Sequence, residues 1–109
     1  MTMGEERIAQ LREEIDAINA ELLDLIARRL DVSVQIGAVK QKAGLPLYSE
    51  DRERDLLERF RAAAIERDID PDYVEELMAV VLTHSRAAQR EEIRSASPRP
   101  PNDAGRVDG

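Results

Sequence analysis

The sequence predicts an all-α protein of three helices, the first of them very long. Apolar residues recur at steps of three and four in three separate segments, which is the spacing of a helix with one buried face. No segment shows the signal of a β-strand, in which apolar and polar residues alternate between two clusters of turn residues. Of the 109 residues, 42% are hydrophobic but only 3% are aromatic, which suits a bundle built from Leu, Ile, Val and Ala.

The first predicted helix covers residues 5–43 and ends before Gly44 and Pro46. Its apolar residues form a seam close to a heptad: Ile8, Leu11, Ile15, Ile18, Leu22, Leu25, Val32, Ile36 and Val39. At ~1.5 Å per residue the helix is roughly 55–60 Å long. A compact domain of this size has a radius of gyration of only about 13 Å. The rest of the chain cannot cover such a helix, so we expect a homodimer that buries the seam.

Two shorter helices are predicted after the first. Ser49 is a candidate N-cap for a helix that ends near Arg67. Asp70 and Pro71 then open a helix that continues to about Ile93, with aspartate as the cap and proline at the first helical position. We expect residues 1–4 to fray. Residues 1–94 are predicted to form one domain and 95–109, with three prolines and few large apolar residues, a disordered C-terminal tail.

Charge and composition exclude several classes of function. The net charge of -7 argues against binding to nucleic acid or to an anionic membrane surface. The chain has no cysteine and one histidine, His84, so a metal site is not expected. It shows no signal peptide and no apolar run of membrane-spanning length, and we therefore expect a cytoplasmic protein.

Basic residues on the long helix suggest an anion site. Arg29 occupies a position of the seam, where charge is normally excluded. Lys40 follows eleven residues later, close to three helical turns, and so projects from nearly the same side. Arg12 is about 25 Å from Arg29 along the same helix, too far to share a small ligand. If two copies of the helix pack antiparallel, Arg12 of one approaches Arg29 and Lys40 of the other, which would form two equivalent cationic pockets.

Each of these polar residues also has a purely structural interpretation. Arg12 and Lys40 could lay their stems on the seam with their charges in water, and Arg29 could form a buried ion pair. Glu53 could serve only the dipole of the second helix. Gly37 costs ~1 kcal/mol of helix stability relative to alanine, and the expected reason is close approach of another backbone or room for a ligand.

In combination, these positions resemble the all-helical (AroQ-class) chorismate mutases. The similarity covers about residues 7–93, and the order and spacing of its short motifs make it specific. The motifs are residues 11–16 (LREEID), 25–29 (LIARR), 36–40 (IGAVK) and 51–54 (DRER), followed by Ser85 and Gln89.

The resemblance implies an intertwined antiparallel homodimer with two active sites, each shared between the chains. It also implies the rearrangement of chorismate to prephenate, the branch step toward phenylalanine and tyrosine. That reaction is concerted and needs no nucleophile, metal or redox cofactor, so none is expected. With no further domain in the chain, we expect a monofunctional enzyme of the bacterial type.

Carried over residue by residue, the resemblance gives each position a role. Arg29, Arg12 of the partner subunit and Ser85 would hold the two carboxylates, since a guanidinium donates two parallel hydrogen bonds. Lys40 and Gln89 would donate to the ether oxygen, which gains negative charge as its bond to carbon breaks.

Three residues at the start of the second helix complete the predicted site. Glu53 would accept from the ring hydroxyl of the substrate, and Arg52 would line the pocket and help to place Glu53. Ser49 stands where relatives often have aspartate. Whether it contacts substrate or only caps the helix stays open at this point.

Two other functions compete with this interpretation. Isochorismate-pyruvate lyase uses the same scaffold, but that group generally lacks an acid at the position of Glu53. A non-catalytic helical dimerisation module explains the seam and the caps, but not the combination of Arg29, Lys40, Glu53 and Gln89. A helix-turn-helix regulator is disfavoured by the negative charge.

Overall fold

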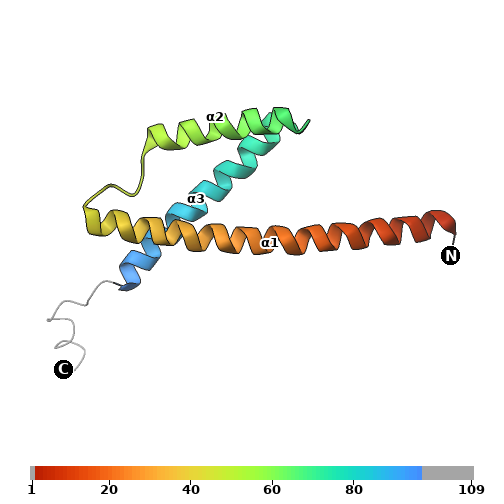
Figure 1. Cartoon of the computed structure of the whole chain (residues 1–109), viewed down its shortest axis with the longest axis horizontal. Coiled ribbons are helices and arrows are strands. Elements are labelled where there is room, and N and C mark those ends of the chain that lie inside the picture. Colours follow the sequence, from red (N-terminus) through yellow and green to blue (C-terminus); the bar gives the residue numbers. More distant parts are fainter. Residues whose placement is uncertain (1, 97–109) are drawn as a thin grey trace, which may run out of the picture. The chain divides into compact units, whose positions relative to one another are not determined.

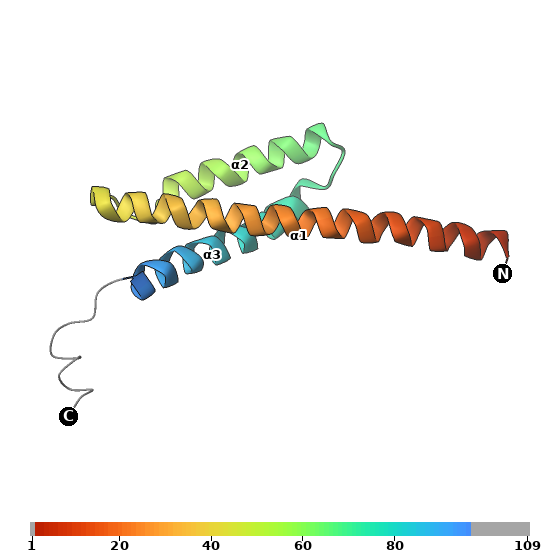
Figure 2. The same ribbon diagram turned by 60° about the horizontal axis from the view of Figure 1, so that its bottom comes forward.

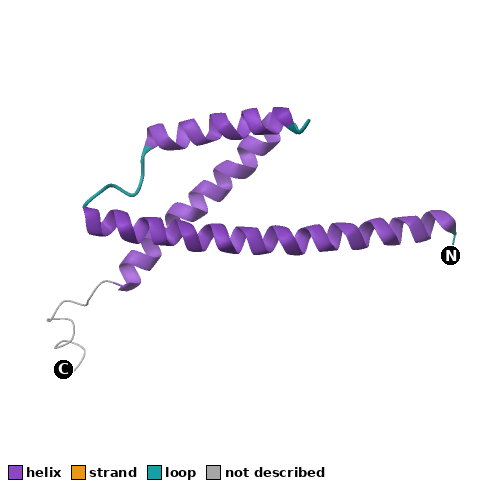
Figure 3. Ribbon diagram, in the orientation of Figure 1, coloured by secondary structure: helices purple, strands orange, loops and turns teal. Residues whose placement is uncertain are grey.

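A computed structural model describes residues 2–96 and contains three helices (Figure 1). They are α1 (Met3–Ala43), α2 (Glu50–Glu66) and α3 (Pro71–Ala96), and Figure 3 shows that the rest of the described chain is loop or turn. The predicted all-α fold with a very long first helix is therefore confirmed. α1 begins two residues before the predicted start and α3 ends three residues after the predicted end. The remainder of the predicted tail, residues 97–109, lies outside the described residues.

Both ends of α1 are closed by local hydrogen bonds. The Thr2 hydroxyl accepts from the Glu5 amide at 3.0 Å and so acts as the N-cap. At the other end Gly44 has a φ of 70°, the left-handed conformation that glycine adopts without strain. The amide of Leu45 then donates to the Lys40 carbonyl at 2.9 Å, which completes a Schellman motif. The stop that Gly44 predicts is thus confirmed.

The turn between α2 and α3 follows the same rules. Asp68 takes a left-handed φ of 56°, and the Ile69 amide donates to the Ala64 carbonyl at 2.9 Å in a second Schellman motif. Asp70 then caps α3, because its carboxylate accepts from the Asp72 amide at 2.9 Å. Figure 2 shows α2 turning back into α3 through this short connection.

The chain divides into two compact units, residues 1–32 and 33–109. The described part of the first is the N-terminal part of α1. Six apolar residues of its seam are between 42 and 57% exposed: Ile8, Leu11, Ile15, Ile18, Leu22 and Leu25. A contiguous apolar stripe of this length is typical of a surface that another protein covers.

The second unit contains the end of α1 together with α2 and α3. Helices α2 and α3 pack against each other around Ala64 and Leu82, which are 2 and 6% exposed. Arg61 on α2 donates to Asp72 at 2.9 Å and to Glu75 at 3.1 Å, and so ties the two helices together. Among residues 2–96, no helix combines the length and the apolar character that crossing a membrane requires.

Candidate active site

Gln89 on α3 is held against α1 at Gly37. The side chain is 8% exposed, and its Nε2 donates to the Ser33 carbonyl at 2.8 Å. A Cβ placed on Gly37 would lie 3.0 Å from Gln89 Cγ and 3.1 Å from Gln89 Cβ, closer than such atoms normally approach. The sequence predicted close approach of another backbone or room for a ligand at Gly37, but the structure places the Gln89 side chain there instead. Glycine at this position lets the Gln89 amide lie against the backbone of α1.

We predict that Gly37→Ala lowers both the melting temperature and the catalytic rate. Alanine adds ~1 kcal/mol of helix propensity, but overpacking costs ~1–3 kcal/mol. Gln89 Cβ is too close to the α3 backbone to yield without moving the helix. Gly4→Ala is the matched control, because its added methyl meets only Thr2 Oγ1 at an ordinary 3.8 Å. A Gly37→Ala variant as active and as stable as Gly4→Ala would contradict this packing.

Lys40 lies one turn after Gly37 on α1 and is half-buried. Its Nζ donates to the Leu47 carbonyl of the α1–α2 connection at 3.4 Å, a long hydrogen bond. An ammonium group has three N–H donors, so this weak contact leaves donors for a ligand. The Lys40 and Gln89 donors thus come from two helices that meet at Gly37.

Glu53 on α2 is paired with an arginine on α3. Arg86 Nη1 donates to Glu53 Oε2, and the two side chains are only 26 and 22% exposed. The Arg86 guanidinium also lies over the Tyr48 ring, 4.7 Å from its centroid. The hydrogen bond with Glu53 raises the pKa of Arg86 above its usual value, so the guanidinium keeps its charge. Three segments, the α1–α2 connection, α2 and α3, are joined at this pair.

Arg86 and Tyr48 were not among the residues selected from the sequence. The signal that could have found Arg86 is the one that marked Arg29, a charged residue on an apolar helix face. Arg86 lies one turn after the buried Leu82 and next to the buried Ser85. Nothing in the sequence near Tyr48 indicated a contact with α3.

The other predicted residues of the second unit lie on the same helices. Ser85 is 6% exposed on α3, one turn before Gln89. Ser49 is the N-cap of α2, since its hydroxyl accepts from the Arg52 amide at 3.2 Å. The Arg52 side chain is exposed in the first turn of α2. The capping role of Ser49 is therefore confirmed, whereas contact of Ser49, Arg52 or Ser85 with a ligand stays a prediction.

Arg12 and Arg29 belong to the first unit, on α1. The Arg12 side chain is exposed and Arg29 is partly buried. Their approach to each other across a dimer stays a prediction from the helical spacing.

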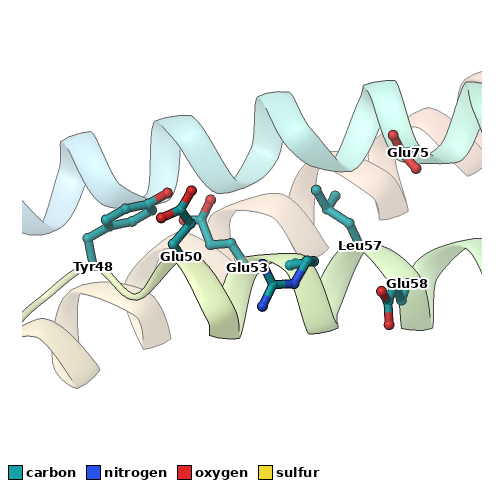
Figure 4. A pocket seen from close by; sticks show the side chains of 7 residues that line it. Tyr48, Glu50, Glu53, Leu57, Glu58 and Glu75 are labelled. Atoms are coloured by element: carbon teal, nitrogen blue, oxygen red, sulfur yellow. The ribbon is translucent and has the colours of Figure 1, made fainter.

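A pocket of about 350 Å³ is lined in part by Glu53 (Figure 4). Four glutamates and one arginine are among its lining residues, and this excess of negative charge makes it unsuitable for an anion. The full lining is Tyr48, Glu50, Glu53, Arg54, Leu57, Glu58 and Glu75. It shares Glu53 with the candidate site but contains neither Lys40 nor Gln89. Among residues 2–96, no three His, Asp or Glu side chains are grouped so that they could hold a metal ion.

The model of the family described as chorismate mutase type II matches residues 11–90. The chain belongs to this family. The resemblance seen in the short motifs is thereby confirmed, and the matched region contains every predicted site residue as well as Arg86 and Tyr48.

Named chorismate mutases and related proteins are among the relatives. The T-protein of Enterobacter agglomerans is 33% identical over 84 residues, which are 77% of this chain and 22% of that protein. The chorismate mutase of Methanocaldococcus jannaschii is 27% identical over 86 residues, 79% of this chain and 87% of that protein. The 4-amino-4-deoxychorismate mutase of Streptomyces venezuelae is 30% identical over 76 residues, 70% of this chain and 74% of that protein. The chain thus spans about a fifth of the T-protein but most of the other two.

Proposed function

We propose that this protein catalyses the rearrangement of chorismate to prephenate, in the cytoplasm, as a step of phenylalanine and tyrosine biosynthesis. The observation that carries the proposal is the contact of α1 with α3 at Gly37, in a chorismate mutase type II chain. There α3 contributes the Gln89 amide, and α1 contributes the Lys40 ammonium one turn further along. The Glu53 carboxylate on α2 supplies the acceptor that the ring hydroxyl of chorismate needs.

The reaction requires stabilisation of charge rather than a chemical group from the protein. As the carbon–oxygen bond breaks, negative charge accumulates on the ether oxygen, and fixed donors bind this state more strongly than the substrate. Gln89 is suited to this because Nε2 carries two N–H donors. One donates to the Ser33 carbonyl at 2.8 Å and fixes the amide, and the second serves the ether oxygen.

The two carboxylates of chorismate are held by Arg29, by Arg12 of the partner subunit and by Ser85 in this proposal. Bidentate arginine contacts fix the flexible side chain of the substrate over its ring, which is catalysis by orientation. An antiparallel, intertwined homodimer supplies the second arginine. The exposed seam of residues 8–25 supports it, because pairing two long helices would remove that apolar surface from water.

The remaining residues orient the ring. Glu53 accepts from the ring hydroxyl, Arg52 lines the pocket on the α2 side, and Ser49 caps α2 so that Glu53 is presented from a fixed first turn. The catalytic domain is residues 1–94, and we propose no role for the tail in the reaction.

A direct assay tests the proposal. Purified protein is incubated separately with chorismate, isochorismate and 4-amino-4-deoxychorismate, and the products are separated by chromatography. We expect chorismate to be converted to prephenate with the highest kcat/KM of the three. Faster release of pyruvate from isochorismate would reassign the chain as an isochorismate-pyruvate lyase. If none of the three substrates is converted, the proposed function is wrong and the chain is a non-catalytic dimerisation module.

A further inference from the structure

Arg86 occupies one side of the Glu53 carboxylate and leaves the other for a ligand. Its Nη1 donates to Oε2, whereas a carboxylate has lone pairs on both oxygens. Oε1 can therefore accept from a substrate while Oε2 stays bound to Arg86. The centroid of the Tyr48 ring, 4.7 Å from the guanidinium carbon, provides a second contact for Arg86. The carboxylate is fixed in direction by contacts that no ligand has to supply.

The same contact changes the charge that a ligand meets. Glu53 alone would attract a cation, but Glu53 with a permanently charged guanidinium beside it is a nearly neutral pair. A neutral hydroxyl still donates a good hydrogen bond to Oε1. A protonated amine at the same ring position is instead repelled by Arg86, since both carry positive charge beside one carboxylate.

We propose that Arg86 is a positioning residue that makes the Glu53 subsite selective for a substrate with a ring hydroxyl over one with a ring ammonium. The inference rests on the proposed function, in which Glu53 faces the ring substituent. Arg86 acts through Glu53 and contacts no reacting atom. Tyr48 contributes by holding the guanidinium in place.

Two substitutions of Arg86 separate charge from packing. Arg86→Met keeps the length of the stem and removes the charge, whereas Arg86→Lys keeps the charge and removes the planar guanidinium. For each variant, kcat and KM are measured with chorismate and with its analogue that carries an amine in place of the ring hydroxyl. Melting temperatures are recorded for all proteins.

In Arg86→Met we expect the ratio of kcat/KM for the hydroxyl substrate to that for the amine to fall roughly 10- to 100-fold, the range for a hydrogen bond to a charged group. Arg86→Lys should retain most of the preference. Tyr48→Leu should weaken it to a smaller degree. In a Glu53→Gln background, Arg86→Met should change the ratio by a different factor than in the wild-type background, because residues in contact do not act additively.

The outcomes keep the inference separate from the proposed function. A wild-type protein that does not convert chorismate would refute the proposed function itself. If the wild type is active but Arg86→Met changes both substrates equally, or changes only the melting temperature, the pair is structural and the inference is wrong. The same conclusion follows if Arg86→Lys loses as much preference as Arg86→Met.

Discussion

Replacing Lys40 with alanine should lower kcat for chorismate by about two to three decades. Loss of one fixed donor to an oxygen that gains charge typically costs ~3–4 kcal/mol of transition-state stabilisation. The ammonium of Lys40 makes one long contact, 3.4 Å to the Leu47 carbonyl, and so contributes little to folding. A stopped or continuous assay of prephenate formation measures the loss of kcat. Circular dichroism measures helix content and shows whether folding is affected.

Lys42 provides the control for this variant. It is the other lysine of the chain, lies two residues further on α1 and is exposed. Lys42→Ala removes the same charge from the same helix and should leave kcat unchanged. If kcat falls equally in the two variants, Lys40 contributes only a positive charge on α1 and not a hydrogen bond to the ether oxygen.

Gln89→Glu should make the activity depend strongly on pH. A neutral amide donates at any pH, whereas a carboxyl group donates only when protonated. The site is buried, which raises the pKa of a carboxyl group introduced there, because burial disfavours the charged form. The variant should therefore lose about two to three decades of kcat at pH 8. It should recover only part of this loss as the pH falls through that raised pKa, because a protonated carboxyl has one O–H donor where the amide has two N–H donors.

Profiles of kcat/KM between acidic and alkaline pH distinguish this effect from simple loss of fold. Gln41→Glu adds the same charge to an exposed position of α1 and should retain the profile of the wild type. If Gln89→Glu is equally impaired at every pH, then Gln89 does not act by donating a hydrogen bond to the ether oxygen.

The helices were predictable because their ends are set by neighbouring residues. Gly44, Ser49 and Asp70 each close or open a helix through hydrogen bonds within a few residues, and each signal is visible in the sequence. α3 extends three residues beyond the end predicted near Ile93, and a surface ion pair lies in this last part of the helix. Arg94 donates to Glu91 at 2.7 Å, one turn apart, and supports a further turn of helix.

Contacts between distant residues were predictable only in part. The cost of glycine in a helix indicated a close approach at Gly37, but not that Gln89 makes it. Arg86 and Glu53 are 33 residues apart, and neither position in the sequence indicates that the other is its partner. The helical period places a residue on a face of its own helix. It does not specify which residue of another helix lies opposite.

Activity in a mixture of two inactive variants tests the shared site most directly. Arg12→Ala and Lys40→Ala each impair every site of their own homodimer. If each site takes Arg12 from one chain and Lys40 from the other, a mixed dimer contains one intact site and one doubly impaired site. After co-refolding in equal amounts, about half of the dimers are mixed, and about a quarter of the wild-type activity should return. A mixture no more active than its separate components would contradict a site built from two chains.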